Sequence, residues 1–270
     1  MKADEIRGLL RESLRKVAET RPLVHHITNY VVMNDTANLT LCLGALPVMA
    51  HAQEEVEEMA SQAHAVVLNM GTPSPAWEKS LLLAGKKAAE SGKPVVLDPV
   101  GAGATSYRTR LARTLVEEVR PTVIRGNVAE IASLLGLESE IRGVESLSSQ
   151  DPCQLARQAA EALRCVVAVT GEKDAVSDGE RTYLVANGHP MLGRITGTGC
   201  MATTAVAVLL CSGGPALELT AGALALFGLA GEEAARIAGE RPGTFRVELF
   251  DSLHRLTGHI PVGRLLVEEA

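Results

Sequence analysis

PVVLDPVGAGATSYRTRLARTLVEEVRPTVIRGN, residues 94–127, contains the pattern that decides the fold class. A short apolar run, Val95 to Leu97, precedes a glycine-containing loop, a helical segment over residues 105–119 and a second apolar run at Val123-Ile124. A strand, a helix and a strand in this order form the repeating unit of a parallel sheet. The segment therefore predicts an α/β protein.

The same alternation continues on both sides of this segment. Toward the N-terminus we expect strands at 23–27, 46–49 and 65–68, and helices at 3–19, from a cap at Thr28 or Asn29 to Leu43, at 53–62 and at 74–91. Toward the C-terminus we expect a helix at 127–136, an irregular connection at 138–150, a helix at 151–163, a strand at 165–169, a loop at 187–196, and helices at 198–211, 215–238 and 244–256. Asp178-Gly179, between apolar runs at 175–177 and 182–185, predicts a tight antiparallel hairpin.

Composition narrows the class of protein. Hydrophobic residues make up 46% of the 270 residues but aromatic residues only 3%, so aliphatic side chains must fill the core, as in helices packed on a parallel sheet. Without a second-domain linker, residues 1–270 are expected to form one domain. The formal charge of −6 and the lack of a basic run argue against nucleic acid as a partner.

Three further features concern location. The N-terminal segment mixes charges at helical spacing, unlike a signal peptide, and no window of about 18 apolar residues would span a bilayer. The five cysteines are scattered, without C-x-x-C pairing or metal-ligand spacing. We expect a soluble protein in the reducing cytoplasm.

The strongest local signal is Ile195-Thr-Gly-Thr-Gly-Cys-Met201, which leads directly into an apolar helix. Glycines allow successive backbone N–H groups to point toward one place, and a helix start adds about half a positive charge there. The turn at residues 197–200 is therefore a candidate cradle for phosphate. The pattern alone is equally compatible with a glycine-rich helix start that binds no ligand.

Other polar residues follow the predicted strands, where α/β proteins collect ligands. Asp98 ends one strand, and Asn127-Val-Ala-Glu130 follows the next. On its own the second segment favours a capping box, yet beside Asp98 the Glu130 carboxylate could hold Mg²⁺ or its water shell. Arg125 is placed to clamp phosphate oxygens, and Thr170 ends a further strand. Either residue could instead be purely structural.

These segments resemble hydroxyethylthiazole kinases of the ribokinase-like superfamily. The resemblance runs from about residue 21 to residue 212 and includes PLVHHITNYVVMN (22–34), PVMAHA (47–52), DPVGAGA (98–104), VIRGNVAE (123–130), VTG (169–171), NGHP (187–190) and TGTGC (196–200). Each motif is short, but their occurrence in this order is specific. His26 stands where the family has a cysteine, which affects the expected substrate fit rather than the class.

The resemblance implies a three-layer α/β/α ribokinase-like fold with a mostly parallel sheet and no lid domain. It implies Mg²⁺- and ATP-dependent phosphorylation of 4-methyl-5-(2-hydroxyethyl)thiazole, which feeds thiamine phosphate synthesis, by a homotrimer with active sites at subunit boundaries. Carried over by position, the resemblance implies that the thiazole is contacted by Met49, Asn29 and Gly197. It implies that ATP is contacted by Arg125 and Thr170, and that the metal and phosphates are bound by Asp98 and Glu130.

Cys200 occupies the position at which many members of the superfamily carry an aspartate base. A helix start tends to lower a thiol pKa, which would favour a thiolate, whereas a buried structural cysteine is equally compatible with the residue type. Phosphoryl transfer depends mainly on positioning and charge neutralisation. We therefore expect Gly197, Gly199 and the backbone amides of the turn to matter more than the sulfur of Cys200.

Three alternatives stay open at this stage. A hydroxymethylpyrimidine or hydroxymethylpyrimidine-phosphate kinase would share the superfamily. An NAD-dependent dehydrogenase would use Gly101-Ala-Gly103, although the third glycine of the dinucleotide fingerprint is missing. A non-catalytic binding or assembly protein would associate through the alanine-rich helices at 215–238.

Overall fold

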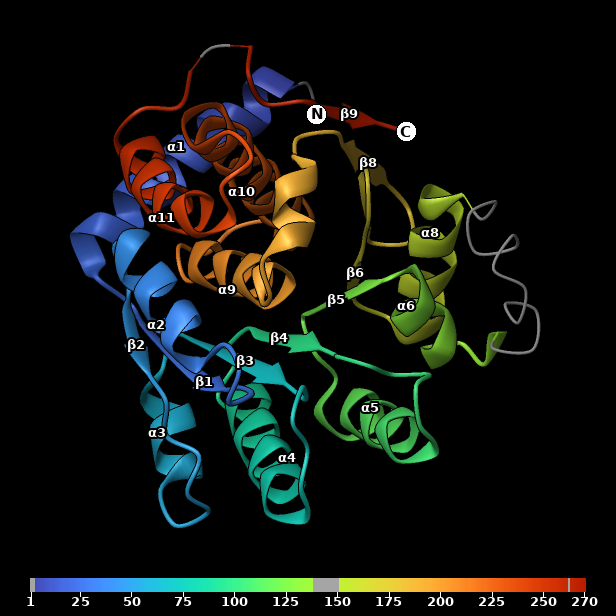
Figure 1. Ribbon diagram of the computed structural model, residues 1–270. Coiled ribbons are helices and arrows are strands. Elements are labelled where there is room, and N and C mark those ends of the chain that lie inside the picture. Colours follow the sequence, from blue (N-terminus) through green and yellow to red (C-terminus); the bar gives the residue numbers. More distant parts are fainter. Residues whose placement is uncertain (1–2, 138–150, 262) are drawn as a thin grey trace.

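A nine-stranded mixed sheet runs through the computed structural model, which describes residues 3–137, 151–261 and 263–270 (Figure 1). The strand order is β2-β1-β3-β4-β5-β6-β7-β8-β9. The strands from β2 to β6 pair in parallel, and the pairs β6–β7, β7–β8 and β8–β9 are antiparallel. Their bounds are β1 Leu23–Ile27, β2 Leu46–Val48, β3 Ala65–Asn69, β4 Val95–Asp98, β5 Val123–Asn127, β6 Val166–Thr170, β7 Asp174–Ser177, β8 Thr182–Val185 and β9 Val267–Glu269.

Helices cover both faces of the sheet (Figure 1). One face carries α1 Ala3–Thr20, α2 Met33–Cys42, α9 Thr198–Leu210, α10 Ala216–Ala238 and α11 Pro242–Gly258; the other carries α3 Val56–Gln62, α4 Pro75–Glu90, α5 Ser106–Val119, α6 Val128–Leu134 and α8 Pro152–Leu163. In β3, Ala65 and Val67 pack on the first face, and Val66 and Leu68 on the second. This alternation is the period of a strand buried on both sides, and it confirms the three-layer α/β/α prediction.

The carboxyl ends of the parallel strands bring polar residues together along one edge of the sheet. Asn69 at the end of β3 lies opposite Asp98 at the end of β4, and Asn127 at the end of β5 lies opposite Thr170 at the end of β6. The start of α9 reaches the same edge, because Thr203 contacts Asp98. Residues that are far apart in the sequence therefore meet there.

Most predicted elements are confirmed, including the antiparallel hairpin of β7 and β8 around Asp178-Gly179. The predicted cap of α2 is wrong: the helix begins at Met33, because the Asn29 side chain accepts a hydrogen bond from Val31 N and donates another to Asn69. The helix expected from residue 53 begins at Val56. The expected loop at 187–196 contains a short 3₁₀ helix, Pro190–Arg194, and β9 was not predicted. The irregular connection expected at 138–150 lies outside the described residues.

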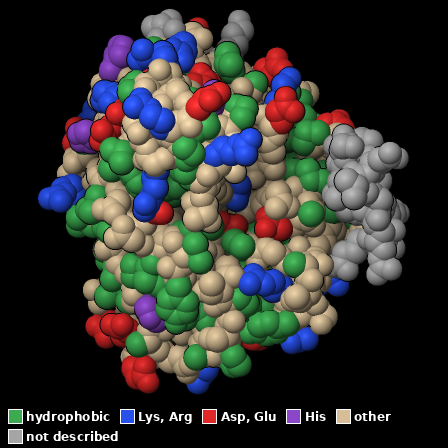
Figure 2. Space-filling view, in the orientation of Figure 1, with side chains coloured by type: hydrophobic (Ala, Val, Ile, Leu, Met, Phe, Trp, Pro, Cys, Tyr) green, Lys and Arg blue, Asp and Glu red, His purple; other side chains and the backbone are tan. Residues whose placement is uncertain are grey.

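Two surface properties bear on possible partners. Among the helices of the described residues, none is both long and apolar enough to cross a membrane. On the face in Figure 2, Lys and Arg side chains are interspersed with Asp and Glu side chains rather than gathered in one basic area.

Candidate active site at the carboxyl edge of the sheet

The first turn of α9 is the part of the site that offers backbone N–H groups. Its N-cap, Gly197, has a φ of +87°, in the left-handed region, and no side chain caps the helix. A Cβ at this position would collide with the Val32 side chain, so both the backbone conformation and the available space require glycine. Because the first amides of a helix lack intrahelical partners, the turn at residues 197–200 can bind an anion.

Asp98 is the most deeply buried charged residue of the site, with only 1% of its surface exposed. Its Oδ2 atom accepts hydrogen bonds from Asn69 Nδ2 and Thr203 Oγ1, each at 2.9 Å. Its Oδ1 atom is buried without a hydrogen-bond partner among the described residues, and lies 3.9 Å from Arg125 Nη1. Burial raises the pKa of Asp98 to about 6, although Arg125 opposes the shift.

The unpaired Oδ1 atom of Asp98 bears on metal binding. A buried carboxylate oxygen without a partner is costly, and a cation or a metal-bound water would satisfy it. Within the described residues, no group of three or more His, Cys, Asp or Glu side chains is arranged to hold a metal ion. Mg²⁺ commonly binds through one or two carboxylates together with substrate phosphates and water. Asp98 therefore fits Mg²⁺ that arrives with a nucleotide.

Arg125 connects the turn of α9 to the ends of β5 and β6. Its Nη2 atom donates to Thr170 Oγ1 at 2.5 Å. Its guanidinium packs so closely on the helix start that a Cβ at Gly199 would meet Nη1 at 2.6 Å. The Arg125 side chain is only 14% exposed, and its buried Nε has no hydrogen-bond partner among the residues described. The structure thus brings Arg125, Thr170, Gly199 and Asp98 together.

Glu130 forms the predicted capping box at the start of α6. Asn127 Oδ1 accepts from Glu130 N, and Glu130 Oε2 accepts from Asn127 N, both at 2.9 Å. The other oxygen, Oε1, accepts from Gly101 N at 2.8 Å. Both oxygens are therefore already bonded to backbone amides, although each keeps a lone pair that could accept from a metal-bound water.

The glycine loop after β4 uses its own amides within the protein. Gly101 N donates to Glu130, and Gly103 N donates to Thr109 Oγ1 at 3.0 Å. In a dinucleotide-binding loop the backbone would instead approach the pyrophosphate. The contacts therefore argue against the dehydrogenase interpretation of Gly101-Ala-Gly103.

Cys200 is a protonated thiol in this environment. Burial raises its pKa to about 12, and the negative charge of Asp98 adds to the shift. Asn29 Nδ2 donates to the sulfur at 3.6 Å. Of the two alternatives for Cys200, this environment disfavours the thiolate, because desolvation outweighs the partial charge of the helix end. The alternative of a structural cysteine is supported, and Cys200 is half-buried.

Asn29 and Met49 lie on the β1–β2 side of the site. Asn29 is 4% exposed and donates to Asn69 Oδ1 at 2.8 Å. Met49 directly follows β2, and the next carbonyl, that of Ala50, is hydrogen-bonded to His25 Nε2. Asn29 therefore belongs to the hydrogen-bonded cluster around Asp98, whereas Met49 lies at the outer end of the same sheet edge.

Sequence reasoning missed Asn69 and Thr203, the two donors to Oδ2 of Asp98. Asn69 is the last residue of β3, one residue beyond the predicted end of that strand. Thr203 lies one turn after Gly199 and so points to the same side of α9. A search for polar residues at every strand end, and one turn into the glycine-led helix, would have found both.

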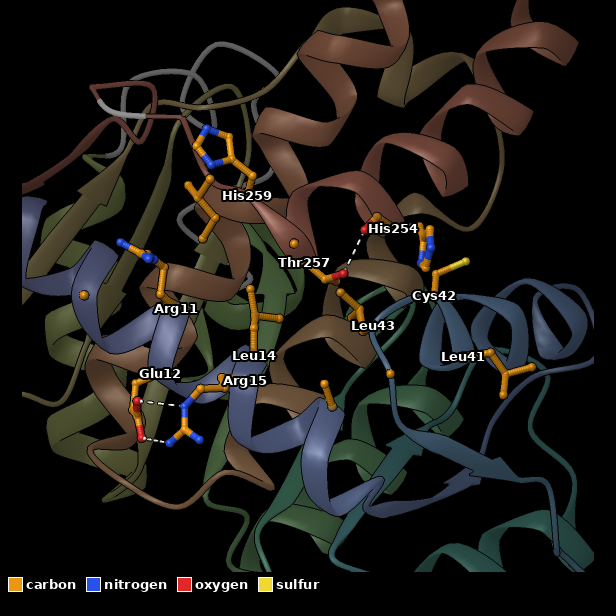
Figure 3. Close-up of a pocket in the computed structure, with 15 residues that line it drawn as sticks. Arg11, Glu12, Leu14, Arg15, Leu41, Cys42, Leu43, His254, Thr257 and His259 are labelled. Carbon is orange, nitrogen blue, oxygen red and sulfur yellow. Dashed lines mark hydrogen bonds and ion pairs between the residues drawn. The ribbon is translucent and has the colours of Figure 1, made fainter.

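A groove of about 680 Å³ lies elsewhere, between α1, the end of α2 and the end of α11 (Figure 3). Leu43 and Gly44, which line it, precede β2, so the groove is at the amino edge of the sheet. Its Arg15 side chain is hydrogen-bonded to Glu12 and Glu19. The groove is therefore separate from the cluster around Asp98.

Comparison with known proteins gives a consistent result along the chain. The model of the hydroxyethylthiazole kinase family matches residues 14–259. A hydroxyethylthiazole kinase of Roseiflexus sp. (strain RS-1) is 52% identical over 255 residues, which are 94% of each protein. One of Methanocella arvoryzae is 50% identical over 258 residues, 95% of each protein.

Solved structures agree with this result. The hydroxyethylthiazole kinase protein of Pyrococcus horikoshii OT3 matches with a TM-score of 0.87 and 45% identity, over 97% of this chain and 99% of that one. The pyridoxal kinase of Staphylococcus aureus, solved with pyridoxal, matches with a TM-score of 0.63 and 16% identity, over 92% of this chain and 97% of that one. The second match is a likeness of fold alone, and it agrees with the predicted ribokinase-like architecture. The chain belongs to the hydroxyethylthiazole kinase family.

Proposed function

We propose that the chain transfers the γ-phosphoryl group of ATP to the primary alcohol of 4-methyl-5-(2-hydroxyethyl)thiazole, and that the reaction takes place at the turn of residues 197–200. The supporting observation is the convergence of Asp98, Arg125 and the uncapped start of α9, in a chain of this family. An unpaired carboxylate oxygen, a guanidinium and free amides are the groups that phosphoryl transfer requires.

In this proposal the phosphates lie at the first turn of α9, beside the Arg125 guanidinium that packs on Gly199. The amides of residues 197–200 stabilise the negative charge that is transferred, and Arg125 and Thr170 bind the nucleotide. The hydrogen bond from Arg125 to Thr170 supports a fixed guanidinium, which loses little freedom when phosphate binds. Gly199 supports the same arrangement, because its missing side chain leaves room for the guanidinium.

Mg²⁺ would be held by Asp98, with Glu130 acting through water. When bound, the ion neutralises phosphate charge and orients the transferred group. The buried, unpaired Oδ1 of Asp98 supports the first role. The use of both Glu130 oxygens in backbone hydrogen bonds favours an indirect contact over direct ligation.

The acceptor would lie beside Gly197, between Asn29 and Met49. A soft thioether such as that of Met49 packs well on a flat heteroaromatic ring. The Cys200 thiol, whose pKa burial raises to about 12, lies beside Asn29 and is a poor proton acceptor. Because a loose phosphoryl-transfer transition state needs little help from a base, the thiol contributes mainly by filling space beside the alcohol.

A panel of alcohols tests the acceptor. Purified protein with ATP and Mg²⁺ is expected to form ADP with hydroxyethylthiazole and to form far less with hydroxymethylpyrimidine or its phosphate. Mass spectrometry of the product would identify the phosphorylated alcohol. Phosphorylation of the pyrimidine without the thiazole would refute the proposal, and the absence of ADP with every acceptor would favour a non-catalytic protein.

The proposal includes a homotrimer with active sites at subunit boundaries. Tyr30 and Val31 directly follow Asn29, and they are 68% and 59% exposed. Two apolar side chains exposed beside the acceptor site support coverage by a second subunit. Sedimentation equilibrium should give three times the chain mass of 28.5 kDa; a mass of one chain would contradict the trimer.

The proposal also includes the domain organisation of the chain and its location in the cell. Residues 1–270 would form one domain, which is supported by the single sheet shared by all described strands. The protein would reside in the cytoplasm, where its five free thiols would remain reduced.

A further inference from the structure

We propose that Thr203 and Asn69 are positioning residues: they hold Oδ2 of Asp98 and so keep its Oδ1 free for the metal or its water. The inference rests on the proposed role of Asp98 and adds the two groups that set its orientation. Both are fully buried, with 0% of their surface exposed, and they approach the same oxygen from α9 and β3.

Thr203 has one hydroxyl proton and two acceptors within reach. Asp98 Oδ2 lies at 2.9 Å, and the carbonyl oxygen of Gly199, one turn earlier in α9, lies at 3.3 Å. The shorter contact is to a carboxylate, which binds a donor more strongly than a neutral carbonyl does. The proton is therefore directed to Asp98, so the anion turn and the carboxylate are connected through one side chain.

Asn69 is oriented by contacts on both sides of its amide. Its Oδ1 accepts from Gly71 N at 3.0 Å and from Asn29 Nδ2 at 2.8 Å. Because both partners are donors, the amide cannot be reversed without losing two hydrogen bonds, and Nδ2 must face Asp98. Asn69 thereby connects the acceptor side of the site to its metal side.

These two donors prevent Asp98 from closing on Arg125. Arg125 Nη1 is 3.9 Å from Oδ1, well beyond the 2.7–2.9 Å of a strong charge-assisted bond. Without its partners at Oδ2, the carboxylate would turn and pair tightly with the guanidinium. Such a pair would remove Asp98 from the metal and Arg125 from the phosphates at once.

Thr203 and Thr204 form a matched pair for testing this inference. Both are fully buried residues of α9, and each lies within hydrogen-bond distance of the carbonyl four residues earlier. Only Thr203 also contacts Asp98. Thr203→Val and Thr204→Val therefore remove the same group from the same helix, and differ in the bond to the carboxylate.

The measurements are kcat and KM for both substrates, the melting temperature, and binding of Mn²⁺ in the presence of a non-hydrolysable ATP analogue. We expect Thr203→Val to lower kcat about 10- to 100-fold, the range for a slightly misplaced catalytic group, and to weaken Mn²⁺ binding about tenfold. The KM for thiazole should stay within about twofold, Thr203→Ser should restore kcat, and Thr204→Val should resemble wild type.

Equal kcat and Mn²⁺ affinity in the two valine variants, or no recovery in Thr203→Ser, would overturn the inference. If Thr203→Val does not fold, Asn69→Ser tests the same oxygen from β3, with the same expected loss of Mn²⁺ affinity. The variant Asp98→Asn distinguishes failure of the positioning inference from failure of the proposed function. Wild-type Mn²⁺ binding by Asp98→Asn would refute the metal role itself, whereas weak binding by Asp98→Asn with normal Thr203→Val would refute only the positioning role.

Discussion

Two helices, α6 and α9, begin at the same edge of the sheet, but their first turns differ. The start of α6 is closed by its own residues, since Asn127 and Glu130 satisfy each other's backbone amides. The start of α9 has glycine at the N-cap and no side-chain cap. The first turn of α6 bonds its amides to side chains of the protein, whereas no side chain caps the first turn of α9.

A count of glycines does not show this difference between the two helix starts. The loop after β4 is rich in glycine, yet the amides of Gly101 and Gly103 are bonded to protein side chains. At α9 the conformation of Gly197 and the packing of Arg125 on Gly199 leave no room for a side chain at either glycine. What distinguishes the α9 turn from these two places is that no side chain caps it and that it lies beside Arg125 and Asp98.

The largest expected effect comes from filling the uncapped turn. Gly197→Asp adds a side chain where φ is +87°, collides with Val32 and places negative charge at the phosphates. We expect kcat/KM to fall by more than about 100-fold, as when an oxyanion donor is lost. Gly213→Asp is the control, because Gly213 also has positive φ, at +71°, but faces open space. Comparable losses of kcat/KM in both folded variants would contradict a special role for the α9 turn.

An intermediate effect is expected from the capped turn. Glu130→Gln keeps one acceptor but loses the charge, so we expect stability to fall by about 1 kcal/mol, as for other cap losses. If Glu130 also orders metal-bound water, the Mg²⁺ concentration for half-maximal rate should rise several-fold. Asn127→Ala, which removes the cap but keeps the carboxylate, should lower stability without this rise. If the rate depends on Mg²⁺ concentration in the same way in both variants, Glu130 acts only as a helix cap.

The smallest expected effect on activity comes from removing the sulfur of Cys200. With the pKa of Cys200 at about 12, no appreciable thiolate forms between pH 7 and pH 10. Cys200→Ala should therefore retain activity within about tenfold of wild type, far above Gly197→Asp, because general-base catalysis would contribute more than this. The ratio of wild-type to variant rate should stay constant over that pH range. A ratio of wild-type to variant rate that rises with pH would indicate that a Cys200 thiolate acts as the base. A Cys200→Ala variant less active than Gly197→Asp would indicate the same.

The layers and most strand ends could be predicted from the sequence, because they depend on the local alternation of apolar runs and helical segments. Asp98, Arg125, Thr170 and Gly199 were predicted at strand and helix ends, and the structure brings them together. What the sequence could not supply were contacts set by tertiary packing. Asn69 and Thr203 are ordinary residue types in ordinary positions until the sheet places Asp98 between them.

The open alternative at Cys200 and the wrong cap of α2 have a similar origin. The Cys200 pKa depends on burial, which outweighs the local effect of the helix end. The start of α2 depends on Asn29, whose side chain bonds to β3 instead of capping the helix. In both cases a local rule was overridden by a neighbour distant in the sequence.

The final strand has a practical consequence for anyone who trims or tags the chain. β9 pairs with β8, Ala270 N donates to Thr182 O, and Asn187 accepts from Leu266 N. Deleting residues 265–270 would leave β8 as an open edge, the kind of surface that recruits strands from other molecules and leads to aggregation. A fusion partner joined after Ala270 through a flexible spacer would keep that edge covered.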